Sequence, residues 1–67
     1  MGTYKIIDIV GTSKKSFSDA ASNAVAEVAK TVKKIRRAEV IKMDVKVEND
    51  KPVLYRAEMK ISFEIER

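Results

Sequence analysis

The chain has 67 residues, contains neither cysteine nor histidine, and carries a formal net charge of +4 at pH 7. The missing residue types exclude disulfide bonds and the usual Cys/His zinc sites. A domain this small buries only about 60% of the surface that its unfolded chain exposes, so subunit association is the remaining source of stability. We therefore expect residues 1–67 to form one domain that self-associates.

Targeting and membrane signals are missing from the sequence. No apolar run approaches the roughly 20 residues that a membrane-spanning helix needs. The first residues lack the charged and apolar regions of a signal peptide. We therefore expect a cytoplasmic protein with no membrane partner.

The first predicted element is a strand at residues 4–10, which is rich in β-branched residues. Gly11 follows it, and we expect this glycine to allow a sharp exit of the backbone from the strand. Ser16 is expected to cap the helix that follows, and Asp19 has the spacing of a capping-box partner of Ser16.

The second predicted element is a helix at residues 17–34. Its apolar residues recur at helical spacing: Phe17, Ala20, Ala21, Ala24, Val25, Val28, Ala29 and Val32. Most of them are alanine, so the helix can approach a sheet closely. Lys30, Lys33 and Lys34 are expected in the last turns, where positive charge complements the helix dipole.

Two further strands, at residues 38–47 and 53–65, are predicted to form a hairpin around a loop at residues 48–51. The last strand alternates between apolar and polar residues over its whole length. The alternation of the strand before it breaks between Ile41 and Met43, which indicates a β-bulge or a strong twist there.

The predicted fold class is α+β. The order of elements is βαββ, with a three-stranded antiparallel-type sheet wrapped on one helix and the strands in the order 2-3-1. A right-handed crossover through the helix then makes the first two strands parallel to each other. The long hairpin extends beyond what one helix can cover, so it leaves sheet surface for neighbouring subunits.

Catalysis is not expected, because the chain has neither histidine nor cysteine to act as base or nucleophile. The basic residues of segment 30–37 suit a helix end better than a nucleic-acid site, because no aromatic side chains are interleaved with them. Residues 48–50 are too short for a calcium-binding EF-hand loop. A metal site shared between symmetry-related subunits stays open, with its ligands unknown.

Four segments follow one another in a characteristic order: residues 4–16, Ile35-Arg36-Arg37-Ala38-Glu39-Val40, Tyr55-Arg56 and Ile61-Ser62-Phe63. Their order and spacing resemble the dodecins, small proteins that assemble into hollow dodecamers. The resemblance covers essentially the whole chain without an insertion. It implies a non-enzymatic homododecameric cage, whose partner is the chain itself, that binds or buffers a small ligand.

The resemblance also implies a ligand pocket. In flavin-binding dodecins a tryptophan at the start of the second strand stacks on the flavin ring, and a glutamine after a tyrosine on the third strand hydrogen-bonds it. The resemblance places Arg37 at the first position and Arg56, which follows Tyr55, at the second. A flavin (FMN, FAD or riboflavin) is thus implied at Arg37, Tyr55 and Arg56, but with weak binding, because a guanidinium carries a charge that must be solvated or paired.

Three alternatives to flavin stay open. Two arginines per subunit, repeated around a symmetric pocket, would form an anion site, unless Glu39 and Glu58 neutralise them internally. Some dodecin-like proteins are described as calcium-binding, so calcium or another divalent cation is the second alternative. The third is a purely structural oligomeric module without a ligand.

Overall fold

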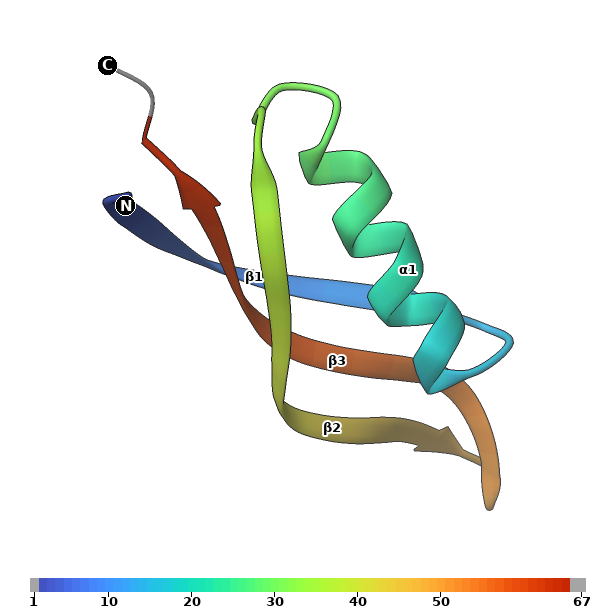
Figure 1. Ribbon diagram of the computed structural model, residues 1–67. Helices are drawn as coiled ribbons and strands as arrows, with labels where there is room; N and C mark the ends of the chain where they lie inside the picture. Colours follow the sequence, from blue (N-terminus) through green and yellow to red (C-terminus); the bar gives the residue numbers. More distant parts are fainter. Residues whose placement is uncertain (1, 66–67) are drawn as a thin grey trace.

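The computed structural model describes residues 2–65. The elements are β1 (Tyr4–Ser13), α1 (Phe17–Val28), β2 (Ile35–Glu48) and β3 (Lys51–Glu64). β3 lies between β1 and β2 and is antiparallel to both, so β1 and β2 are parallel to each other. α1 covers one face of this strongly curved sheet (Figure 1). The predicted βαββ fold and the strand order 2-3-1 are confirmed.

The core lies where α1 meets the centre of the sheet. Alternate residues of β3 face the helix, and Ala57, Met59 and Ile61 are each no more than 1% exposed. Ala20 and Ala24 of α1 are also buried and pack in one cluster with Ala57 and Met59. The predicted apolar face of the last strand therefore forms the floor of the core.

Gly11 serves a different purpose from the predicted one. β1 continues through it to Ser13, and within residues 2–65 no glycine has a positive φ. A Cβ at Gly11 would lie 2.3 Å from the carbonyl oxygen of Ala20 and 2.8 Å from the Cβ of Ala24. The prediction of a chain exit at Gly11 was wrong, because the glycine instead makes room for the helix backbone.

The N-terminus of α1 is held by two serines and an aspartate. The backbone N–H of Asp19 donates to Oγ of Ser16 at 3.0 Å, which confirms the predicted cap. The return bond of a capping box is replaced, because the N–H of Ser16 donates to Oγ of Ser13 at 3.4 Å. The Ser13 hydroxyl in turn donates to the Asp19 carboxylate at 2.6 Å, so these bonds connect the end of β1 to the helix start.

α1 ends at Val28, six residues before the predicted end, and its last turn contains no basic residue. The dipole explanation of the three lysines was therefore wrong. Thr31 and Val32 are β-branched and favour helix only weakly. Lys34 has a φ of 61°, and its carbonyl oxygen accepts a hydrogen bond from the N–H of Glu64 at 3.0 Å. The chain must leave the helix early to reach the sheet there.

The predicted bulge in β2 is confirmed at Ile41. Val40 lies opposite Met59, whereas Lys42 lies opposite Glu58, so Ile41 is the extra residue. The bulge reverses the alternation of β2. Beyond the bulge, Lys42 and every second residue after it in β2 face away from the helix.

The hairpin turn follows the prediction as well. Asn49 and Asp50 have φ values of 53° and 62°, which is the left-handed conformation that these two residue types tolerate best after glycine. β2 and β3 are both longer than predicted, at 14 residues each.

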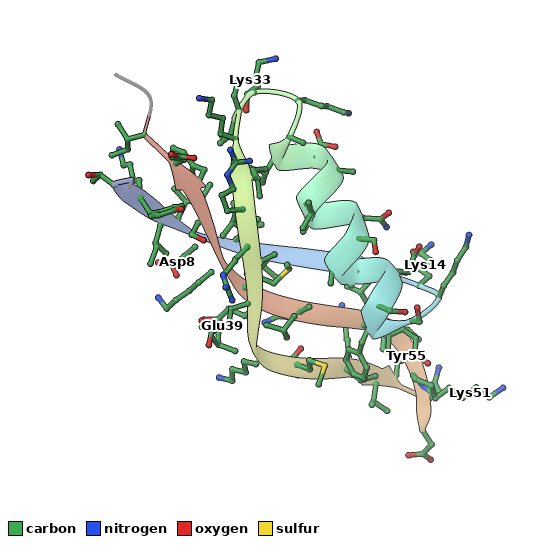
Figure 2. All side chains as sticks on the ribbon, viewed as in Figure 1. Asp8, Lys14, Lys33, Glu39, Lys51 and Tyr55 are labelled. Atoms are coloured by element: carbon green, nitrogen blue, oxygen red, sulfur yellow. The ribbon has the colours of Figure 1, made fainter. Side chains whose placement is uncertain are left out.

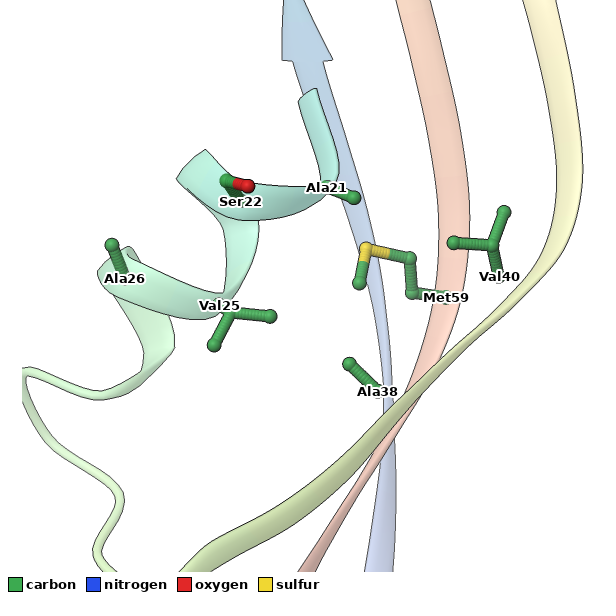
Figure 3. A pocket seen from close by; sticks show the side chains of 7 residues that line it. All are labelled: Ala21, Ser22, Val25, Ala26, Ala38, Val40 and Met59. Carbon is green, nitrogen blue, oxygen red and sulfur yellow. The ribbon is translucent and has the colours of Figure 1, made fainter. Parts of the chain in front are cut away.

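A groove remains beside the helix, because α1 packs on β1 and β3 and leaves much of β2 uncovered. Its volume is about 410 Å³. Figure 3 shows the side chains that line it: Ala21, Ser22, Val25, Ala26, Ala38, Val40 and Met59. Large apolar side chains are exposed over the subunit, Val40 in the groove among them: Tyr4, Ile6, Val10, Val40, Ile41, Met43, Val47 and Ile65. One subunit therefore leaves much apolar surface uncovered.

None of the helical structure in residues 2–65 is long and apolar enough to cross a membrane.

Candidate functional site

The charged side chains of the sheet gather on its outer face, the face that points away from α1. Ala57, Met59 and Ile61 point toward the helix, so the residues between them on β3 point outward. Arg56 lies on this outer face opposite Asp44, and Arg37 lies opposite Ser62. Both predicted arginines therefore share one face of the sheet.

Arg56 forms a two-bond ion pair with Asp44. Its Nε is 2.9 Å from Oδ1 of the carboxylate, and its Nη2 donates to Oδ2 at 3.4 Å. Both side chains are 48% exposed, so the pair adds little stability, but it fixes the plane of the guanidinium. The observed partner is thus Asp44 and not Glu39 or Glu58, which the sequence analysis had named.

Tyr55 lies on the opposite face of the sheet from Arg56. Its ring meets the ring of Phe17 edge to face, with centroids 5.1 Å apart and planes at 78°. Such a pair stabilises the packing of the helix start on β3. Figure 2 shows Tyr55 beneath the first turn of α1. In this subunit Tyr55 supports the core instead of facing the two arginines.

Arg37 and Arg56 are far apart within one subunit. The β3 residue opposite Arg37 is Ser62, six positions from Arg56 along the strand. At the rise of a β-strand this separation is about 20 Å. One chain therefore does not bring the three predicted ligand residues together, and only copies from different subunits could do so.

Lys60 occupies the centre of the outer face. Its Nζ donates to Oδ1 of Asp8 at 2.9 Å. This hydrogen bond and the negative charge of Asp8 raise the pKa of Lys60, with smaller contributions from Glu39 and Glu58. Asp8 and Glu39 both project from the side of the sheet away from the helix (Figure 2). Lys60 is thus paired with Asp8 and lies opposite Glu39 of the neighbouring strand.

Metal ligands are dispersed on one subunit. Within residues 2–65, no three carboxylates gather closely enough to hold a metal ion. Calcium needs six to eight oxygen ligands, several of them usually from carboxylates. A cation site on this chain would therefore need ligands from more than one subunit.

A shallow pocket on the outer face contains two residues that the sequence analysis did not connect with Arg37. Tyr4 and Ser62 line it together with Arg36 and Arg37. The signal was present, because the two-residue period of β1 and β3 assigns Tyr4 and Ser62 to the outer face. The missing information was the register that brings them beside Arg37.

Comparison with known proteins identifies the class to which this fold belongs. The family model of Dodecin matches residues 3–66. The chain is 40% identical over 65 residues to calcium dodecin from Mycobacterium tuberculosis. This match covers 97% of this chain and 92% of calcium dodecin. The chain therefore belongs to the dodecin family.

Two solved structures illustrate the relationship. Calcium dodecin of Mycobacterium tuberculosis, described as a calcium-chelating immunodominant antigen with a novel calcium-binding site, superposes with a TM-score of 0.84 at 39% identity. That match covers 96% of this chain and 91% of the other. Dodecin from Streptomyces coelicolor superposes with a TM-score of 0.94 at 27% identity, over 98% and 94% of the two chains. This chain therefore shares its backbone fold with both of these structures.

Proposed function

We propose that this chain is the subunit of a non-enzymatic homododecameric shell that binds calcium ions and has lost tight flavin binding. The observation that carries the choice of ligand is the 40% identity to calcium dodecin along 97% of the chain. Three features of the subunit support the proposal, and they are taken in turn below.

The uncovered apolar surface supports assembly. The fully buried large side chains of the described subunit are Met59 and Ile61, while eight large apolar residues are exposed. The groove beside α1 has an almost wholly apolar lining. Monomeric proteins rarely expose apolar surface on this scale. Contacts between subunits would cover it and supply the stability that a 67-residue chain lacks.

The two arginines argue against tight flavin binding. By family resemblance they occupy the positions of the flavin-stacking tryptophan and of the glutamine that hydrogen-bonds the ring. The Arg56 guanidinium is engaged by Asp44, so two of its donor groups are already used. Arg37 can stack on a planar ring, but its charge must then stay solvated or find an anion.

The distribution of carboxylates supports a cation site that exists only in the assembly. Asp8, Glu39 and Glu58 lie near Lys60 on the outer face of each subunit. Symmetry axes of an oligomer bring copies of one carboxylate together, and such rings suit a hard divalent cation. Calcium binding should therefore depend on assembly.

Light scattering tests the assembly. We expect a particle of about twelve times the 7.5 kDa subunit mass at micromolar concentration. The physical reason is the uncovered apolar surface described above. A monomer under these conditions would contradict the proposed shell.

Calcium and riboflavin titrations test the ligand. In phosphate-free buffer we expect calcium to raise the melting temperature of the chelator-treated shell, with magnesium at equal concentration having a smaller effect. Riboflavin should bind weakly, as measured by quenching of its fluorescence, and Arg37→Trp combined with Arg56→Gln should strengthen it. Tight riboflavin quenching by the unmodified chain, or no response to calcium, would contradict the assignment; a shell that binds neither ligand would be a structural module.

A further inference from the structure

The positive charge of the chain is concentrated in one segment. Of the 14 basic residues, five lie in residues 28–38, and this segment contains no acidic residue. The nine basic residues that remain are outnumbered by the 10 acidic residues of the chain. The net charge of +4 therefore comes entirely from residues 28–38.

Three of these basic residues form an exposed loop. Because α1 ends at Val28, Lys30, Lys33 and Lys34 lie between the helix and β2, and all three are exposed. Residues 29–34 are called the basic loop below. Figure 2 shows Lys33 where the chain passes from α1 to β2. The helix dipole does not explain these lysines, so their purpose is open.

The charges of the basic loop are only weakly balanced. Nζ of Lys30 lies 3.2 Å from Oε1 of Glu27, but the two side chains are 69% and 74% exposed, so an anion in solution can replace this pair. Lys33 has no hydrogen-bond or ion-pair partner among residues 2–65. The loop thus presents one unbalanced ammonium group and a second that an external anion can engage.

We infer that the basic loop binds the phosphate backbone of duplex nucleic acid. Lysine is a flexible point charge that neutralises a phosphate without a fixed geometry. The absence of interleaved aromatic residues excludes stacking on the bases of a single strand, but contacts with the backbone of a duplex need no stacking. With the dipole explanation gone, the charge of the loop favours a polyanion.

The composition of the loop favours nucleic acid over an anionic membrane. A basic segment that lies on a membrane surface also presents large apolar side chains to the lipid. None of the large apolar residues that are exposed in the described part of the chain lies in the basic loop. Several copies of the loop on one particle would strengthen binding to a long duplex, and this gain alone depends on the proposed shell.

Fluorescence anisotropy with a labelled DNA duplex, in a calcium-free buffer that contains a chelator, tests the inference. We expect binding in about 50 mM salt that weakens about fortyfold in about 200 mM salt if three phosphates are neutralised. Lys30→Gln combined with Lys33→Gln should weaken binding at least about tenfold and lower the slope of log affinity against log salt by about 2.

Two further double variants complete the experiment. Lys14→Gln combined with Lys15→Gln is the matched control, because it removes the same charge from exposed lysines at the other end of α1. Lys30→Arg combined with Lys33→Arg keeps the charge of the loop. We expect both to bind the duplex within about threefold of the unmodified chain. Light scattering should show the same particle size for every variant.

Several outcomes would overturn the inference. They are the absence of duplex binding in low salt, binding that does not weaken as salt rises, equal losses in the two glutamine variants, and a tenfold loss in the arginine variant. Phosphatidylglycerol vesicles that bind as tightly as the duplex would overturn the choice of nucleic acid. A monomer in light scattering would contradict the proposed shell, whereas the comparison between the variants would still test the loop.

Discussion

Gly11→Val is expected to lower the free energy of unfolding by about 3 kcal/mol, the upper part of the range for overpacking a close contact. The reason is geometric. A Cβ at this position would lie 2.3 Å from the Ala20 carbonyl oxygen, and backbone atoms cannot move aside as a side chain can. α1 would have to shift away from β1 and lose its packing on the sheet.

Urea denaturation at a fixed protein concentration measures this loss, because the stability of a self-associating protein depends on its concentration. Thr12→Val is the matched control, since it introduces the same residue into β1 at an exposed position on the outer face. We expect it to change stability by no more than about 0.5 kcal/mol. Equal midpoints for the two variants would show that α1 does not approach β1 as closely as the structure indicates.

Ile61→Ala is expected to destabilise the protein by about 2–5 kcal/mol. Ile61 is completely buried on the helix side of β3, so its removal loses apolar burial and leaves a cavity. Ile6→Ala is the matched control, because Ile6 is 59% exposed on the outer face of the neighbouring strand. Thermal unfolding followed by circular dichroism compares the two variants.

The informative result of this experiment is which of the two variants, Ile61→Ala or Ile6→Ala, loses more stability. A larger loss for Ile6→Ala than for Ile61→Ala would mean that the outer face is the more deeply buried one in the assembled protein. Such a result would contradict the assignment of the core to the helix side of β3, while the oligomer size would show whether subunit contacts are responsible.

The sheet could be predicted from the sequence because its signals are local. The alternation of β3 assigns each residue to a face, and the positive φ values of Asn49 and Asp50 follow from residue type. The end of α1 could not be predicted in this way. It depends on a tertiary constraint, the hydrogen bond from the N–H of Glu64 to the Lys34 carbonyl oxygen. Residues 29–34 contain no glycine or proline that would mark the helix end in the sequence.

The candidate site shows why the ion-pair partner of a side chain is harder to predict than the face of the sheet on which that side chain lies. Continuing the register of Val40 and Met59 without a bulge would place Met43 opposite Arg56. The bulge at Ile41 brings Asp44 there instead, and this single inserted residue creates the ion pair. The sequence indicated that a bulge exists, but not how the register continues beyond it. Contacts between subunits are harder still to predict, because no local sequence pattern indicates which residues meet across them.

The central position of β3 has a consequence for synthesis on the ribosome. β1 and β2 each hydrogen-bond to β3 within the sheet, and not to each other. A nascent chain that has emerged only as far as Glu48 therefore has no sheet. Its β1 and β2 segments stay unpaired until β3 has been synthesised. At about 5–20 residues per second, β1 waits about 3–10 s for residues 51–64. During that interval the future core strands are open to chaperones and to other nascent chains.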